Sequence, residues 1–522
     1  MPNCKRGKTM RKDLSVSLSV LFILVSLSAC SHTGAQAQSF LSAGTVESAV
    51  VETAQPVTIE SASSSGAEAE AGEIRITLSD QGSSSDSASV QINGSTVTIT
   101  EAGDYRVSGT LSNGQLRIQA AEDAKVRLIL DGASVTCSGG AAIYAVTADK
   151  VVISTVENSS SLITSTGEFI QTDENNVDAA IFAKCDLTLK GEGALGVSCE
   201  TGHGIVTKDD LKLNGGTVSV NAAGQGLSGK DSVTVSDGIF SIVCGTDGIH
   251  SDDTVLIEGG EISLSAGDDG IHADNTLTIG GGVLTIPQSY EGLEANNIVI
   301  NDGIITIKAS DDGINAAGGN DGSHAFGPFG GDPFRGDSGS TLTINGGQLT
   351  INAEGDGLDA NGELLVTGGV IYVSGPTNNG NGALDYGTSA AITGGTVIAA
   401  GSSGMAENFG SGSTQGTILL NLSGSVPAGT LVSISDESGT VLASYTPEKS
   451  FSSVVISTEA MTVGNAYTVQ IGSASTAIQL DSYVYGSGHG MGPGGMGGMG
   501  GSPGGGPPGG QGGGPPGGGR RP

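Results

Sequence analysis

Residues 245–266 read GTDGIHSDDTVLIEGGEISLSA and residues 267–288 read GDDGIHADNTLTIGGGVLTIPQ, so two adjacent segments of 22 residues nearly repeat each other. The same spacing extends outward from this pair, with an aliphatic residue at Ile205, Leu227, Ile249, Ile271 and Leu293. A fixed period of this length, carrying three short strand-like runs in each unit, is typical of a parallel β-solenoid. Any residue type that recurs at one position of the unit then forms a straight row, with about 4.8 Å between coils.

Within each unit, three groups of aliphatic residues are expected to point into the solenoid and to stack on the same groups in the next coil. The Gly-Gly pairs at 259–260 and 346–347 fall between the second and third strands, where a tight corner favours a positive φ. Between Ile314 and Leu358 the spacing doubles to 44 residues, which predicts one coil with an inserted loop at 317–339. We therefore predict an all-β chain with a three-stranded coil of about 22 residues and a small C-terminal β domain.

Composition divides the rest of the chain. The predicted segments are a lipoprotein signal peptide at 1–29, a flexible Ser/Ala/Glu tether at 30–72, an N-terminal β cap with the first coils at 73–135, the solenoid at 136–410, a C-terminal β cap or sandwich at 411–486, and a disordered Gly/Pro/Met tail at 487–522. The signal assignment depends on a basic start, a short apolar run and the sequence LSAC ending at Cys30, which resembles the bacterial lipobox. Lipid on Cys30 would anchor the protein to a membrane at the cell surface, and an ordinary cleaved signal with a chance cysteine is the alternative.

The formal net charge is −33, which disfavours binding to nucleic acid or to anionic membrane faces. Cations, neutral polymers, or anionic polymers bridged by a divalent cation remain suitable partners. Cys137, Cys185, Cys199 and Cys244 lack metal-ligand spacing, and we interpret them as free thiols. We expect a monomer.

Acidic residues recur at fixed positions next to the aliphatic column. The predicted metal ligands are Asp247, Asp252, Asp269, Asp274, Glu291, Glu294, Asp312, Asp356 and Asp359. Stacked like charges repel, and a hard divalent cation with oxygen ligands would offset that repulsion. Calcium is therefore the predicted cofactor. A solvated acidic face screened by salt is one alternative, and a transition-metal site at His250 and His272 is another.

The stretches TITEAGDYRVSGTL (98–111), AEDAKVRLILDGASVT (121–136), VDAAIFAKCDLTL (177–189) and GIVTKDDLKLNGGTVSV (204–220), together with the DGIHADNTLTIGGG repeat, resemble a family of bacterial carbohydrate-binding lipoproteins. The resemblance covers roughly residues 73–400. It implies a right-handed parallel β-helix, related in shape to pectate lyases, that holds calcium and binds plant or cell-wall polysaccharide. The inserted loop departs from the family pattern.

The inserted loop carries aromatic side chains in a chain with only 4% aromatic residues, and aromatic faces stack on sugar rings. The predicted substrate-binding residues are Phe326, Phe329, Phe334, Tyr290 and Arg335. A loop whose Phe residues pack on each other is the alternative. We predict a non-catalytic, calcium-dependent protein that binds acidic pectic or cellulosic glycans. A lyase acting on uronate polymers, with Arg335 as the available base, and a calcium-stabilised adhesin or spacer are the competing functions.

Overall fold

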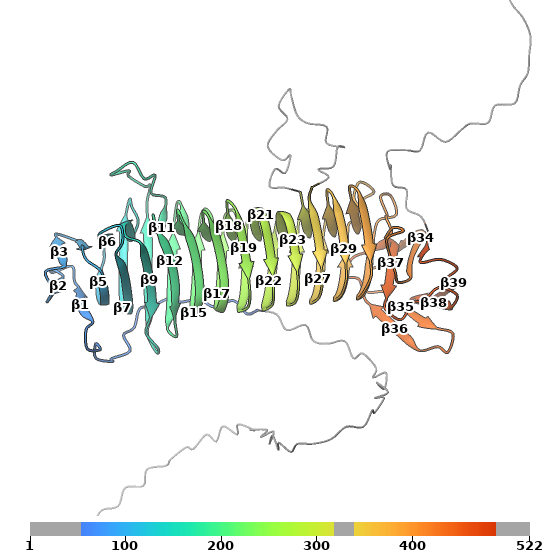
Figure 1. Ribbon diagram of the computed structural model, residues 1–522, viewed down its shortest axis with the longest axis horizontal. Coiled ribbons are helices and arrows are strands. Elements are labelled where there is room, and N and C mark those ends of the chain that lie inside the picture. The colour runs from blue at the N-terminus through green and yellow to red at the C-terminus, as the bar shows by residue number, and fades with distance from the viewer. Residues whose placement is uncertain (1–53, 318–338, 487–522) are drawn as a thin grey trace, which may run out of the picture. The chain divides into compact units, whose positions relative to one another are not determined.

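The computed structural model describes residues 54–317 and 339–486, and within these ranges the chain forms strands joined by turns and bends, without a helix. It follows that this part of the chain holds no apolar helix of bilayer-spanning length. Figure 1 shows the strands stacked in a row of coils, which begins at the N-terminal cap and ends at a smaller β domain. The predicted parallel β-solenoid is confirmed.

Each coil contributes a strand to each of three parallel faces. The first face contains β8 (Ile143–Thr147), β11 (Ala179–Ala183), β14 (His203–Thr207), β16 (Leu227–Gly229), β18 (Ile249–Ser251), the start of β21 (Ile271–Ile279), the start of β23 (Leu293–Ile300), β25 (Ile314–Ala316), β28 (Leu358–Ala360) and β31 (Leu384–Tyr386). The second face contains β9 (Lys150–Thr155), β12 (Asp186–Gly191), the starts of β15 (Asp210–Ala222) and β17 (Ser232–Cys244), β19 (Thr254–Ile257), the ends of β21 and β23, β26 (Thr341–Ile344), β29 (Glu363–Val366) and β32 (Ser389–Ile392). The third face contains β10 (Ser160–Thr166), β13 (Ala194–Cys199), the ends of β15 and β17, β20 (Glu261–Ser265), β22 (Val283–Ser289), β24 (Ile304–Ala309), β27 (Gln348–Ala353), β30 (Val370–Ser374) and β33 (Thr396–Gly401).

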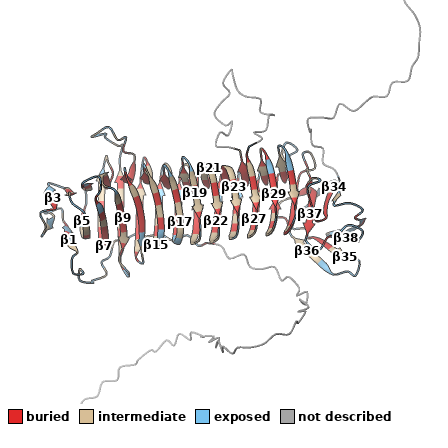
Figure 2. Cartoon of the chain, in the orientation of Figure 1, coloured by how far each residue is buried: buried red, intermediate tan, exposed pale blue. Residues whose placement is uncertain are grey.

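The aliphatic column of the first face stays in register from coil to coil. Ile249 pairs with Ile271, which pairs with Leu293, and each of these side chains is at most 1% exposed. One continuous cluster of buried apolar residues runs from Ile76 to Val455 along the interior (Figure 2). Burial of apolar surface at about 25 cal/mol per Å² stabilises this otherwise Gly-rich chain.

Glycine is required at two places in the coil. At the corners between the second and third faces, Gly260 and Gly347 have φ of 90° and 85°, as the sequence predicted. A second glycine directly precedes the aliphatic column. At that position neighbouring atoms of the solenoid lie too close to leave room for a side chain. A Cβ on Gly270 would lie 2.4 Å from the Gly292 carbonyl oxygen and 2.7 Å from Ile286 Cδ1.

The solenoid continues in register across the inserted segment. Ile314 on β25 pairs directly with Leu358 on β28, and Ile298 on β23 pairs with Leu342 on β26. The 44-residue spacing therefore corresponds to a single coil interrupted by an insertion. Residues 318–338, which contain most of that insertion, lie outside the described ranges.

The N-terminal cap combines two antiparallel pairs with the first parallel coils. It contains β1 (Ile74–Leu78), β2 (Ser84–Ser85), β3 (Val90–Asn93), β4 (Thr96–Ile99), β5 (Gly103–Leu111), β6 (Gln115–Gln119) and β7 (Lys125–Ser138). β1 pairs with β2 and β3 pairs with β4 in the antiparallel sense, while β4 and β6 lead in parallel to β8.

The predicted tether at 30–72 is wrong for its second half, because residues from Ala54 onward lie against the third face. The Ala54 amide donates to Thr285 Oγ1 at 2.8 Å, and the amides of Ser63 and Ser160 donate to each other's carbonyls at 2.8 Å. Composition suggested a flexible segment, but the hydroxyls of Thr285 and Ser160 on the third face supply hydrogen-bond partners that composition does not reveal. We call residues 54–66 the strap.

The C-terminal domain is joined to the last coil by continuous hydrogen bonding. It contains β34 (Thr417–Val426), β35 (Val432–Asp436), β36 (Val441–Tyr445), β37 (Phe451–Thr458), β38 (Ala466–Ile471), β39 (Ala474–Gln479) and β40 (Val484–Tyr485). β37 pairs antiparallel with β33 and covers its edge, and β34 pairs with the other side of β37. The rings of Tyr372 and Tyr445 also stack, with centroids 4.7 Å apart, so the domain is docked on the solenoid.

Candidate functional site

Polar side chains line one edge of the first face over its later coils, and we call this set the acidic row. Its members two residues before the aliphatic column are Asp247, Asp269, Glu291, Asp312 and Asp356, and those one residue after it are His250, His272, Glu294, Asn315, Asp359 and Asp385. Backbone hydrogen bonds hold the coils in step, since Gly248 donates to the Asp269 carbonyl and Gly270 to the Glu291 carbonyl, both at 2.9 Å. The two positions meet in space, since Asp247 contacts His250 and Asp269 contacts His272.

In the earlier coils of the acidic row, each histidine bridges carboxylates. His250 Nδ1 lies 2.9 Å from Asp247 Oδ2, and its Nε2 lies 3.3 Å from Asp252 Oδ1. His272 Nδ1 lies 3.1 Å from Asp269 Oδ2 and its Nε2 lies 3.1 Å from Asp274 Oδ1. Asp252 and Asp274, which the sequence placed among the metal ligands, are exposed residues that contact these rings.

The next coil completes a triad around His272. Glu294 Oε2 lies 2.5 Å from His272 Nδ1, so this nitrogen faces two carboxylates from adjacent coils. Burial by itself would lower the pKa of His272, but the hydrogen bonds with Asp269 and Glu294 outweigh burial and raise it to about 11. Burial and the neighbouring Glu294 raise the pKa of Asp269 to about 8. The imidazolium of His272 therefore neutralises charge that would otherwise repel.

Glu291 and Asn315 connect this half of the row to the next. The Asn315 amide nitrogen donates to both carboxylate oxygens of Glu291 at 3.0 Å. Burial, followed by repulsion from Asp269 and Glu294, raises the pKa of Glu291 to about 10, so this carboxyl is protonated at neutral pH. Two neighbouring oxygens, Glu294 Oε1 and Asn315 Oδ1, are buried without a hydrogen-bond partner in the described part of the chain.

The later coils carry oxygen ligands alone. Asp312, Asp356 and Asp359 each offer a carboxylate oxygen, and these oxygens lie within 4.8 Å of one another. Within the described ranges, no Lys, Arg or His forms an ion pair with any of the three. Burial, followed by repulsion from Asp311 and Asp385, raises the pKa of Asp312 to about 7. Burial, followed by repulsion from Asp312, raises the pKa of Asp356 to about 8. The same causes hold the pKa of Asp359 well above its ordinary value.

The oxygen cluster of Asp312, Asp356 and Asp359 fits a hard divalent cation. Calcium takes six to eight oxygen ligands, and carboxylates, amide oxygens and backbone carbonyls are its preferred donors. Two further carboxyls, Asp385 and Glu407, lie nearby. Repulsion from Asp385 contributes to the raised pKa of Asp356 and of Asp359. Burial, together with repulsion from Asp385, raises the pKa of Glu407 to about 7. The mixed group of Asp269, His272 and Glu294 also lies within 4.8 Å, but its imidazole already serves as a counter-ion.

The structure thus divides the predicted metal ligands into two sets. Asp247, Asp252, Asp269, Asp274 and Glu294 contact histidines, whereas Asp312, Asp356 and Asp359 have no cationic partner among the described residues. Glu291, the ninth predicted ligand, belongs to neither set and is held by the Asn315 amide. Sequence reasoning did not include Glu407 because it lies after the last regular coil, where the 22-residue spacing gives no register. It considered the two histidines only as an alternative transition-metal site and did not assign His272 the role of a counter-charge.

Of the predicted substrate-binding residues, only Tyr290 lies in the described ranges. It is half-buried at the turn between β22 and β23, with its amide donating to the Asp268 carbonyl at 2.7 Å. Phe326, Phe329, Phe334 and Arg335 lie outside the described residues, as does Cys30. The four cysteines Cys137, Cys185, Cys199 and Cys244 are free thiols, as predicted.

Known proteins resemble the central part of the chain. A curated carbohydrate-binding domain-containing protein from Acetivibrio thermocellus is 35% identical over 128 residues, which are 24% of this chain and 45% of that protein, so the match spans less than half of the relative. A solved structure described as a polysaccharide lyase-like protein from C. thermocellum, as a gadolinium derivative, is 29% identical with a TM-score of 0.39, and the match covers 45% of this chain and 98% of that one. Residues 93–324 match the model of the family described as carbohydrate-binding domain-containing protein, which confirms the family resemblance expected from the sequence.

Proposed function

We propose that this protein binds polysaccharide in a calcium-dependent way and has no catalytic activity of its own. The family description supports carbohydrate as the ligand class. The observation that carries the calcium part is the cluster of Asp312, Asp356 and Asp359, whose carboxylate oxygens converge within 4.8 Å without a cationic side chain in the described ranges. One divalent cation would remove the repulsion among these groups.

An acidic glycan suits such a site better than a neutral one. With −33 formal charges on the chain, an anionic polymer approaches only where positive charge has been added. A calcium ion held by three carboxylates keeps open coordination positions, which a uronate carboxylate can fill. Pectic chains therefore come first among the glycans to test, with cellulosic chains next.

The cellular location that we propose is the outer side of a membrane. The amino-terminal signal and Cys30 support it, because they are features of an exported lipoprotein. Calcium is available in that location. The strap begins at Ala54 on the third face, so residues between Cys30 and Ala54 are the span that connects a lipid anchor to the solenoid.

The test is binding of the mature protein to polygalacturonate with calcium and with EGTA, while ultraviolet absorbance is recorded. We expect binding in calcium, loss of binding in EGTA and constant absorbance. Rising absorbance from unsaturated uronate would identify a lyase and overturn the non-catalytic part. Absence of binding to polygalacturonate and to cellulose in both buffers would overturn the proposal and favour an adhesin.

A further inference from the structure

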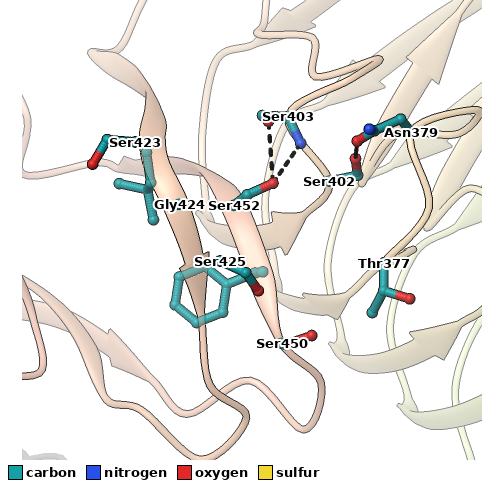
Figure 3. Close-up of a pocket in the computed structure, with 11 residues that line it drawn as sticks. Thr377, Asn379, Ser402, Ser403, Ser423, Gly424, Ser425, Ser450 and Ser452 are labelled. Carbon is teal, nitrogen blue, oxygen red and sulfur yellow. Dashed lines mark hydrogen bonds between the residues drawn. The ribbon is translucent and has the colours of Figure 1, made fainter.

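The junction between the solenoid and the C-terminal domain contains a cavity of about 330 Å³. It lies outside residues 93–324, the part of the chain that matches the family model, and outside the acidic row. Its walls come from the loop after β30, the residues after β33, the end of β34 and the start of β37 (Figure 3). This volume is in the range of pockets that hold small ligands.

A large bulge in β34 creates the cavity. Asn421 on β34 pairs with Ser453 on β37, and the next pair is Val426 with Phe451. The four residues 422–425 therefore lie opposite the single residue Ser452, and the chain bends away from its partner strand. Bulges of this kind re-aim side chains and are frequent next to binding sites. Here the bulge presents Ser423 and Ser425 as exposed side chains at the rim.

The chemistry of the cavity differs from that of the acidic row. The described residues that line it include six serines, one threonine and one asparagine, and none of the lining residues is ionisable. Such a neutral surface is notable in a chain with 54 acidic residues. It offers hydroxyl and amide groups, which donate and accept hydrogen bonds without attracting ions.

Some of these polar groups hold the cavity wall, and others are free to bind. The Ser452 hydroxyl accepts the Ser403 amide at 2.9 Å, and Ser402 donates to Asn379 Oδ1 at 2.7 Å (Figure 3). Within the described part of the chain, the hydroxyls of Thr377, Ser423, Ser425 and Ser450 make no hydrogen bond to protein. The first set fixes the geometry, and the second set offers solvent-facing hydroxyls that a ligand can reach.

We propose that this cavity is a second binding site, which takes one or two rings of a neutral saccharide and works without calcium. A neutral sugar matches the donor and acceptor hydroxyls of the walls, whereas an anionic sugar would find no cation there. Because the walls come from the last coils and from the C-terminal domain, docking of that domain assembles the site. The proposal does not depend on the calcium site, since no residue is shared between the two.

The test is saturation-transfer difference NMR of the full chain in EGTA, with cellotriose, xylotriose, mannotriose and maltotriose offered one at a time. We expect at least one of them to bind with an affinity that does not change between pH 5 and pH 8. Ser425→Trp should abolish this binding by filling the cavity, and Thr377→Val with Ser450→Ala should weaken it about tenfold, because two neutral hydrogen bonds are lost. Ser475→Trp, at an exposed position of β39 in the other sheet of the domain, is the matched control.

Failure of all four trisaccharides to bind would overturn the inference. Binding that persists unchanged in both cavity variants would also overturn it, since the ligand would then lie elsewhere. Because EGTA is present throughout, these outcomes are independent of whether the calcium-dependent binding to polygalacturonate holds.

Discussion

The imidazole rings of His250 and His272 stack in adjacent coils, with their centroids 5.0 Å apart and an angle of 12° between their planes. Each ring contacts carboxylates of its own coil, and His272 also contacts Glu294 of the next coil. His272 thus supplies positive charge to the first half of the acidic row. Among the described residues the second half has no such counter-charge, which is why a metal ion is proposed there and not along the whole row.

Removal of the charge on His272 should destabilise the metal-free protein. His272→Ala leaves Asp269 and Glu294 facing each other in a buried position, and breaking a buried ion pair costs about 3–5 kcal/mol. The expected result is a lower urea midpoint in EGTA, measured by circular dichroism. Thr278→Ala, on the second face of the same coil, should change the midpoint little. An unaltered midpoint in His272→Ala would show that the ring is not a counter-ion.

Asp359→Asn should weaken calcium binding. The substitution keeps the shape of the side chain but removes one of three converging carboxylates. Loss of a group that merely supports a ligand costs about 10- to 100-fold in metal affinity, and a direct ligand should cost at least as much. Isothermal titration calorimetry with CaCl₂ measures this. Asp481→Asn, at an exposed position of the C-terminal domain, should bind calcium as the unaltered protein does. Equal affinities for the two variants would place the ion elsewhere.

The metal-free protein should lose stability as the pH rises. Carboxyl pKa values are about 4 in the unfolded chain, whereas in the folded chain the pKa of Asp312 is about 7 and that of Asp356 is about 8. Between these values the folded state holds more protons than the unfolded state, so the free energy of unfolding falls from about pH 4 to about pH 8. The lowered pKa values of Asp247 and Glu294 act in the opposite direction, but mainly below this window.

Urea midpoints in EGTA at pH 5 and pH 8 measure this effect, and the midpoint at pH 5 should be higher. Saturating calcium should raise the midpoint at pH 8 more than at pH 5, because the ion binds ionised carboxylates and displaces protons. A midpoint in EGTA that rises with pH would contradict the assignment of the raised pKa values.

Gly270→Ala should destabilise the coil without removing any polar side chain. The added Cβ would lie 2.4 Å from the Gly292 carbonyl oxygen, so adjacent coils must move apart. Forcing an extra methyl group into a packed interior costs about 1–3 kcal/mol. Gly424→Ala is the control, because a Cβ at that position would have no neighbour within 4 Å and the residue's φ is not positive. Chemical denaturation that gives the same midpoint for both variants would refute the close-approach explanation.

The repeated segments at 245–288 were enough to predict the solenoid, because a core built from identical positions needs only a correct period. Ile249, Ile271 and Leu293 are in register in the structure as they are in the sequence. The same period predicted that acidic residues would gather along one edge. Local spacing therefore determined both the coil and the composition of the acidic row.

Tertiary structure alone decided which side chains in that row meet. His272 and Glu294 are register partners on adjacent coils, but only the structure shows that one ring nitrogen of His272 contacts both Glu294 and Asp269 of its own coil. It also decided the course of the strap at residues 54–66 and the docking of β37 on β33. The strap contacts and the pairing of β37 with β33 join residues with no periodic relation in the sequence. They depend on shape and on unpaired hydrogen-bonding groups, which become known only once the coils are stacked.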